Sequence, residues 1–290
     1  MPKKRVIAGL IVKGGIVVQS IGFARYLPVG RPEIAARFID SWGIDEIVLI
    51  DIDASHEGRS IAPALVGRVA REIRVPLTVG GGISDTETMR DLLSAGADKI
   101  AINTSAITRP ALVTEAADIF GVQCVIASID ARRHADSRDE VFVSGGRLAT
   151  GRSAAQVAAE LEFAGAGEIL LNSIDRDGAR TGYDLALAKS VGTAIGIPLI
   201  CFGGAGHPDD IAQALAQDWV SAAGAANFWH YTEHSVTIGK AFASARQLDI
   251  RTETGGTYTD YEFLGDGRIA RRDDARLEAQ IFEYFEEDAI

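Results

Sequence analysis

The stretch Ser173-Ile174-Asp175-Arg176-Asp177-Gly178 decides the fold, together with two glycine- and alanine-rich runs that follow it. These runs are Phe202-Gly203-Gly204-Ala205-Gly206 and Ala225-Ala226-Asn227. Each of the three stretches follows a short apolar segment that predicts a β-strand, over residues 168–171, 197–201 and 219–223. Small residues after a strand let backbone N–H groups approach an anion, as in the loops after the last strands of α/β barrels. One glycine pair alone would favour a tight turn, but three runs in register favour an anion site.

An internal repeat indicates the architecture. Residues 76–82 resemble residues 198–204, and residues 46–51 resemble the segment that begins at residue 168, both at an offset of 122 residues. Residues 6–11 resemble residues 125–130 at an offset of 119. Such a period is too long for a solenoid repeat. Two similar halves with four strands each predict a (β/α)8 TIM barrel, an α/β fold with one phosphate-type site in each half.

Composition limits the classes of function. The net charge of −11 argues against nucleic acid as the main partner. Cys124 and Cys201 lie in apolar strand-like runs and are expected to be buried free thiols. His230 and His234 have the spacing of a helical ligand pair but lack an evident third ligand, so we expect neither a metal nor another cofactor. The apolar run 6–12 is too short for a membrane span or a signal peptide, which predicts a cytoplasmic protein that does not contact membranes.

The chain is expected to contain a barrel over residues 1–249 and a C-terminal extension over 250–290. Within the barrel, the sequence predicts an edge hairpin at residues 16–18, a small hairpin within 132–146 and a last helix over 233–247. The extension is polar and aromatic, with a hairpin-like segment and an amphipathic helix over 275–285. Packing on the barrel or self-association is favoured for it over contact with a different partner.

Six runs of the chain carry a family resemblance. Residues 6–13, 51–55, 78–83, 101–104, 127–130 and 173–178 together resemble the cyclase subunit of imidazole glycerol phosphate synthase, and the resemblance covers about residues 4–247. It implies a (β/α)8 barrel. It also implies that a separate glutaminase subunit releases ammonia at the bottom of the barrel, and that the ammonia passes through the interior to a bis-phosphate substrate at the top.

The resemblance assigns roles to individual residues. The residues that it matches to a charged ammonia gate at the barrel floor are Arg5, Glu46, Lys99 and Glu168. The residues that it matches to two phosphate sites are Gly82, Asn103 and Thr104 for the first, and Asp177, Gly178, Gly203, Gly204, Ala226 and Asn227 for the second. Asp130 matches one of two catalytic aspartates. An ion-pair network that closes the floor is the simpler interpretation of the charged residues, and it is compatible with a gate.

One position departs from the family pattern. The internal repeat places Ile11 opposite Asp130, where the family has its second catalytic aspartate. Isoleucine cannot transfer a proton, and a general acid or base contributes roughly 10²–10⁴-fold to a rate. Gln19 also stands where the family usually has a lysine for the substrate phosphate. The pattern therefore predicts that ordinary cyclase turnover is severely impaired.

Three functions follow from these observations. The leading hypothesis is an ammonia-channelling subunit of a glutamine amidotransferase complex. It would serve surface-polysaccharide sugar amidation, because Lys13-Gly14-Gly15 and residues 230–236 resemble that divergent branch, and the resemblance implies a sugar amidotransferase as a further partner. The first alternative is a working cyclase of histidine biosynthesis that uses Asp51 or Asp53 as its second carboxylate. The second alternative is a non-catalytic scaffold that binds a phosphorylated ligand and activates a glutaminase.

Overall fold

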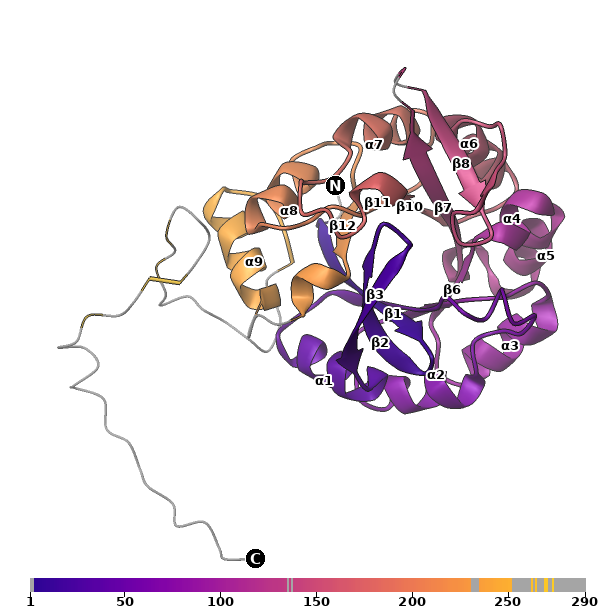
Figure 1. The fold of residues 1–290 in the computed structure, drawn as a ribbon, viewed down its shortest axis with the longest axis horizontal. Coiled ribbons are helices and arrows are strands. Elements are labelled where there is room, and N and C mark those ends of the chain that lie inside the picture. Colours follow the sequence, from indigo (N-terminus) through magenta and orange to yellow (C-terminus); the bar gives the residue numbers. More distant parts are fainter. Residues whose placement is uncertain are drawn as a thin grey trace, which may run out of the picture.

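Eight parallel strands form a closed barrel in the computed structural model, which describes residues 3–134, 136, 138–230 and 235–251 and the single residues 262, 264, 269, 270 and 273. The strands are β1 (Arg5–Lys13), β4 (Glu46–Asp51), β5 (Leu77–Gly80), β6 (Lys99–Ile102), β7 (Val125–Arg133), β10 (Glu168–Ser173), β11 (Leu199–Phe202) and β12 (Ala222–Ala225). Each pairs with its neighbour in this order, β12 pairs with β1, and β10 pairs with β7 to complete the ring (Figure 1). The predicted (β/α)8 barrel is confirmed.

Amphipathic helices surround the barrel (Figure 1). They are α1 (Pro32–Ser41), α2 (Pro63–Ala70), α3 (Thr86–Ser94), α4 (Thr104–Thr108), α5 (Ala111–Phe120), α6 (Ala154–Phe163), α7 (Leu185–Gly192), α8 (Pro208–Leu215) and α9 (Ser235–Ala245). Their starts follow local chemistry: Asp85 caps α3 by accepting a hydrogen bond from the Thr88 N–H, and Pro32 and Pro63 occupy first helical positions. The apolar helix faces pack on the outer side of the strands and form the main core.

Two antiparallel additions occur at equivalent places in the two halves. The hairpin β2 (Ile16–Ile21) and β3 (Arg25–Gly30) extends from β1, and β8 (Asp139–Val143) with β9 (Leu148–Ala149) extends from β7. The register repeats as well, because Ile7 pairs with Glu46 in one half and Ile126 pairs with Glu168 in the other. Both expected hairpins are therefore confirmed. The repeated register is the one that the internal repeat predicts, so the half-barrel repeat is confirmed as well.

The barrel interior is filled by side chains from alternate strand positions. A second apolar cluster lies inside the ring and consists of Ile7, Val48, Ala101, Ile126, Leu170, Ile200 and Ala222. The half-buried ring of Phe202 packs against this cluster. A Cβ on Gly224 would lie 2.0 Å from the Phe202 ring, and a Cβ on Gly9 would lie 2.9 Å from it. Two glycines on β12 and β1 therefore make room for one aromatic ring inside the barrel.

Three expectations about the C-terminal part have different outcomes. The last strand was expected over 219–223 but spans Ala222–Ala225, because the Val220 N–H bonds back to the Gln217 carbonyl in a turn. The last helix is Ser235–Ala245, inside the expected range 233–247. Most of the extension 250–290 lies outside the described residues, so its expected hairpin and helix stay predictions. Among the residues described, no helix has both the length and the apolarity that a membrane crossing requires.

Candidate functional site

A ring of four charged side chains closes the floor of the barrel, where strands β1, β4, β6 and β10 begin. Arg5 Nη1 lies 2.9 Å from Glu46 Oε2, and the same guanidinium also bonds Glu168. Lys99 Nζ lies 3.1 Å from Glu46 Oε2 and 2.7 Å from Glu168 Oε1. Two cations thus alternate with two carboxylates. The structure brings together all four residues that the sequence assigned to a gate, and a gating role stays a prediction.

The ring is electrostatically balanced although it is largely buried. Glu46 is only 2% exposed, and its Oε1 also accepts a hydrogen bond of 2.8 Å from Thr78. Burial acts to raise the pKa of Glu168, but the hydrogen bonds and charges of Arg5 and Lys99 outweigh it and lower that pKa. Arg5 and Lys99 therefore hold the Glu168 carboxylate ionised. Buried pairs of this kind are costly to break, because the remaining ion loses its compensation.

Removing one cation tests this balance. We expect Lys99→Met to lower the free energy of unfolding at pH 7 by about 3 kcal/mol, because Glu46 and Glu168 then share Arg5 alone. Since the pKa of Glu168 is lowered in the folded protein, the stability that its ionisation contributes is present above pH 4.5 and is lost on acidification. The deficit of the variant should therefore shrink below pH 4.5. Urea unfolding at pH 7 and pH 4 measures it.

Lys99→Arg is the matched control for this experiment, because it keeps the charge and should retain most of the stability. Equal unfolding free energies of Lys99→Met and the wild type at pH 7 would contradict the account of the ring.

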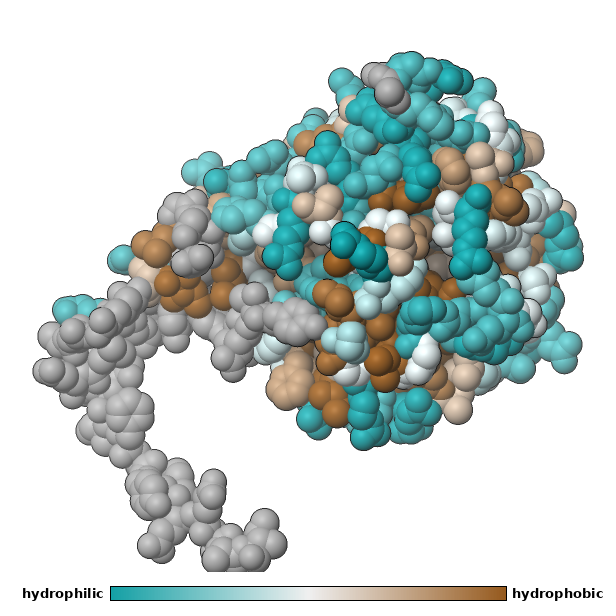
Figure 2. Space-filling model, in the orientation of Figure 1, coloured by the Kyte–Doolittle hydropathy of each residue, from teal (hydrophilic) through white to brown (hydrophobic). Residues whose placement is uncertain are grey.

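At the opposite end of the barrel, the ends of the strands enclose one pocket. The nine residues that the sequence assigned to two phosphate sites all line it. Gly82, Asn103 and Thr104, which we call the first cradle, follow β5 and β6. The second cradle follows β10, β11 and β12 and consists of Asp177, Gly178, Gly203, Gly204, Ala226 and Asn227. Polar side chains surround this face and apolar side chains show at its centre (Figure 2). Both cradles thus open into one space, and phosphate binding by them stays a prediction.

Glycine is required at Gly82 of the first cradle. Its φ is +65°, and a Cβ there would lie 1.8 Å from the Arg59 carbonyl oxygen. The chain at Gly82 therefore lies directly against the loop that follows β4. On the other side of the cradle, Thr104 Oγ1 accepts a hydrogen bond of 3.0 Å from the Ser144 N–H at the β8–β9 turn. The first cradle is thus held between two loops.

Two side chains of the second cradle hold the β2–β3 hairpin in place. The Asp177 carboxylate accepts hydrogen bonds from the Ser20 hydroxyl (2.6 Å) and from the Phe23 N–H (3.2 Å). The Asn227 side chain bonds both backbone groups of Ser20, at 3.1 and 2.6 Å. In this structure these two side chains position the hairpin over the pocket, so the backbone of the glycines and Ala226 is the part of the cradle left to contact an anion.

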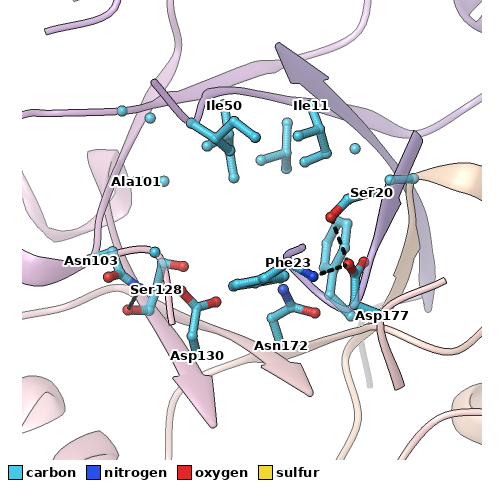
Figure 3. Close-up of a pocket in the computed structure, with 18 of the residues that line it drawn as sticks. Ile11, Ser20, Phe23, Ile50, Ala101, Asn103, Ser128, Asp130, Asn172 and Asp177 are labelled. Atoms are coloured by element: carbon cyan, nitrogen blue, oxygen red, sulfur yellow. Dashed lines mark hydrogen bonds between the residues drawn. The ribbon is translucent and has the colours of Figure 1, made fainter. Parts of the chain in front are cut away.

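Asp130 stands at the pocket end of β7 among polar neighbours. Its Oδ2 accepts a hydrogen bond of 3.1 Å from Asn103, which also bonds the Ser128 carbonyl at 3.0 Å (Figure 3). Burial raises the pKa of Asp130 to about 7, with Asp177 adding to the rise, although hydrogen bonds from Asn172 and Asn103 oppose it. At neutral pH both protonation states are populated, which suits a group that accepts and returns a proton.

The wall opposite Asp130 is apolar. Ile11 pairs with Ile50 across β1 and β4, and Asp130 pairs with Asn172 at the equivalent place across β7 and β10. Figure 3 shows the two isoleucines on one side of the pocket and Asp130 with Asn172 on the other. Ile11 therefore occupies the place that the internal repeat assigned to it. Gln19, by contrast, is buried, and the next residue, Ser20, lines the pocket instead.

The two carboxylates proposed as replacements for a residue at position 11 are engaged elsewhere. Asp51 accepts a hydrogen bond of 2.6 Å from Arg59 and one of 3.1 Å from the Asp53 N–H. Asp53 pairs with Lys13 at 2.5 Å, and this bond lowers the pKa of Asp53. Both aspartates thus hold the loops at the rim of the pocket through these contacts. Asp130 is the carboxylate that combines a raised pKa of about 7 with a place on the pocket wall.

Sequence reasoning missed several pocket residues, among them Phe202, Asn172, His56 and Arg147. The repeat could have pointed to Asn172, which lies 122 residues after Ile50. It would have misled at Phe202, whose equivalent is Gly80. For the metal expectation, His234 lies outside the described residues, and the described residues contain no group of His, Cys, Asp and Glu that could hold a metal ion.

Comparisons with known proteins show which family this chain resembles. The family described as "Histidine biosynthesis protein" matches residues 5–235. A protein of Alkaliphilus metalliredigens named imidazole glycerol phosphate synthase subunit HisF is 44% identical over 250 residues, which cover 86% of this chain and 98% of that protein. A Bacillus cereus protein of the same name is 45% identical over 251 residues, with the same coverage of each chain.

Proposed function

The chain belongs to the histidine-biosynthesis family that includes subunit HisF of imidazole glycerol phosphate synthase, and on this basis we propose that it is the synthase subunit of a two-component glutamine amidotransferase. In this function, ammonia enters through the charged ring, passes along the barrel interior and reacts with a phosphorylated ligand held between the two cradles. The observation that carries the proposal is the placement of Asp130 on the wall of one pocket that both cradles line.

The reaction that the relatives favour is that of imidazole glycerol phosphate synthase, since two proteins with 44% and 45% identity bear this name. Asp130 would serve as both base and acid, because its pKa of about 7 leaves either form available at neutral pH. A bis-phosphate suits the pocket, since each cradle offers backbone groups to one phosphate. With Ile11 opposite, turnover would rest on a single carboxylate and would be slow.

A second candidate is the delivery of ammonia to a separate acceptor, and Ile11 is the observation that favours it. An apolar wall at this place leaves binding and passage intact but removes one proton-transfer group. The expected surface-polysaccharide sugar, and the sugar amidotransferase that would modify it, receive no support from the comparisons, whose relatives are named for imidazole glycerol phosphate synthase.

We place the glutaminase of the proposed complex on another chain. Glutamine hydrolysis by a cysteine needs a thiolate, and the two cysteines of this chain are poorly suited to supply one. Cys201 is buried, and burial raises the pKa of its thiol to about 12. Cys124 is half-buried, ends the short 3-10 helix before β7 and does not line the pocket. The relatives are named as subunits, which also supports a partner.

Affinity purification of the tagged chain from its own cells tests this partnership. We expect a protein with glutaminase activity to co-purify, measured as glutamate released from glutamine, whereas the chain alone should release none. A purified chain that turns over its phosphorylated ligand with ammonium salts, but never carries an associated glutaminase, would contradict the two-component proposal. Glutamate release by the isolated chain would contradict it as well.

A further inference from the structure

We propose that Arg147 and His56 form a basic clamp over the first cradle and complete it as a site for a phosphate dianion. The inference rests on the proposed function, which assigns a phosphate to that cradle. It adds two phosphate-binding side chains that neither the family resemblance nor the internal repeat supplies. Arg147 is the last residue of the β8–β9 turn, His56 lies in the loop after β4, and both line the pocket.

The two loops that carry these residues are the two loops that hold the first cradle. Gly82 packs directly against the loop of residues 54–59, which contains His56. Thr104 bonds the Ser144 N–H in the turn that leads to Arg147. The clamp joins these loops across the cradle, because Arg147 Nη1 lies 3.3 Å from His56 Nδ1. A phosphate on the cradle would therefore lie between the side chains that link its two flanks.

The hydrogen bond between the pair also fixes the chemistry that His56 presents. A guanidinium can only donate, so His56 Nδ1 accepts and the ring proton resides on Nε2. A Cβ on Gly145 would lie 3.4 Å from that Nε2, which places it beside the turn. His56 thus offers an N–H donor on the same side as the turn, and Arg147 keeps further N–H groups for an anion.

The turn itself supports anion binding. Ser144, Gly145 and Gly146 have consecutive positive φ values of 55°, 67° and 76°. Successive backbone N–H groups in such turns can form a concave anion site. The Ser144 N–H is used by Thr104, whereas the N–H groups of Gly145 and Gly146 make no hydrogen bond to other residues that the structure describes. Two backbone donors therefore remain next to the two side chains.

The charged side chains of the pocket also favour a phosphate dianion as the ligand. Within the described part of the pocket, the basic side chains are Lys13, His56 and Arg147, and the carboxylates are Asp51, Asp53, Asp130 and Asp177. Lys13 is paired with Asp53, whereas Arg147 forms no ion pair with a described residue. A cation left without a carboxylate in an otherwise acidic pocket is suited to a ligand that brings its own negative charge.

Titration of the full chain with inorganic phosphate by calorimetry tests the clamp. Arg147→Gln should weaken phosphate binding about 10-fold, since it removes one charge-assisted contact. Arg147→Lys keeps the charge and should bind with an intermediate affinity. Arg138→Gln is the matched control, because Arg138 is exposed, pairs with Asp136 at 2.6 Å and does not line the pocket. It should bind phosphate like the wild type.

A double-mutant cycle assigns the effect to the first cradle. Thr104→Val should weaken phosphate binding, and Arg147→Gln should then have a smaller additional effect, because both residues serve one ligand. Wild-type affinity in Arg147→Gln, with weakened binding in Thr104→Val, would overturn the clamp but leave the proposed function standing. No measurable phosphate binding by the wild type would remove both. Equal melting temperatures of the variants show that folding is not the cause.

Discussion

Replacing Asp130 with asparagine should lower ammonium-dependent turnover of the phosphorylated ligand about 10²–10⁴-fold. Asparagine keeps the size and can still accept a hydrogen bond from Asn103, so ligand binding should change little. Its amide cannot take up and return a proton. Steady-state kinetics should therefore show a loss in kcat rather than a rise in KM, because the interaction that is removed acts in the transition state.

A neighbouring carboxylate provides the control. Asp175→Asn also removes an acid close to the top of the barrel, but Asp175 is exposed and pairs with Arg132 at 3.2 Å. It does not line the pocket, so its loss should leave kcat nearly unchanged. Similar kcat values for Asp130→Asn and the wild type would show that another group transfers the proton.

The pH dependence follows from the pKa of Asp130, which burial raises to about 7. Where Asp130 acts as the base, wild-type turnover should rise with pH and level off above pH 7, and this step should be absent in Asp130→Asn. Stability responds in the opposite direction. Because the pKa of Asp130 is higher in the folded protein than its unfolded value of 3.8, the protonated carboxyl stabilises the fold fully at a pH below 3.8. This stabilisation is lost as the pH rises to about 7. Asp130→Asn should remove that decline.

Introducing a second carboxylate should have the opposite effect on turnover. We expect Ile11→Asp to raise ammonium-dependent kcat, by up to about 10²–10⁴-fold. The internal repeat makes position 11 on β1 equivalent to Asp130 on β7, and the two lie on opposite sides of the pocket (Figure 3). Ile50 lies beside the one and Asn172 beside the other. A carboxylate there would give the pocket a separate acid and base, one on each side of the ligand.

Ile50→Asp is the matched control for this variant. It adds the same charge to the same apolar wall, but at the position equivalent to Asn172 rather than to Asp130. Both variants should lose about 1–3 kcal/mol of stability because a polar group replaces apolar packing. Only Ile11→Asp should gain turnover. An equal gain in both variants, or no gain in either, would contradict the view that positions 11 and 130 act together as acid and base.

The barrel was predictable because the internal repeat can be seen directly in the sequence. The offsets of 122 and 119 residues fix which strands are equivalent, and the register of Ile7 with Glu46 and of Ile126 with Glu168 repeats as expected. The predicted phosphate-site residues and Asp130 share one pocket for a related reason, since the ends of parallel strands meet at one face. The position of Ile11 follows from the same repeat.

Other features depend on contacts between distant segments and could not be predicted. Phe202 fits inside the barrel only because Gly9 and Gly224, on two other strands, lack side chains. The sequence assigned Asp177 and Asn227 to a phosphate site but gave no sign that their side chains also bond Ser20, which lies 157 and 207 residues away. Contacts that place a hairpin over the pocket leave no periodic pattern in the sequence from which they could be predicted. The last strand began later than expected because a turn includes Val220.

The most direct test of the account is ammonium-dependent turnover of the histidine-pathway bis-phosphate by the full wild-type chain, measured beside Asp130→Asn. We predict slow turnover in the wild type and turnover about 10²–10⁴-fold lower in the variant, with bis-phosphate binding retained in both. Tight binding of the bis-phosphate without any ammonium-dependent product in the wild type would contradict a catalytic role for this barrel. It would also favour delivery of ammonia to a separate acceptor.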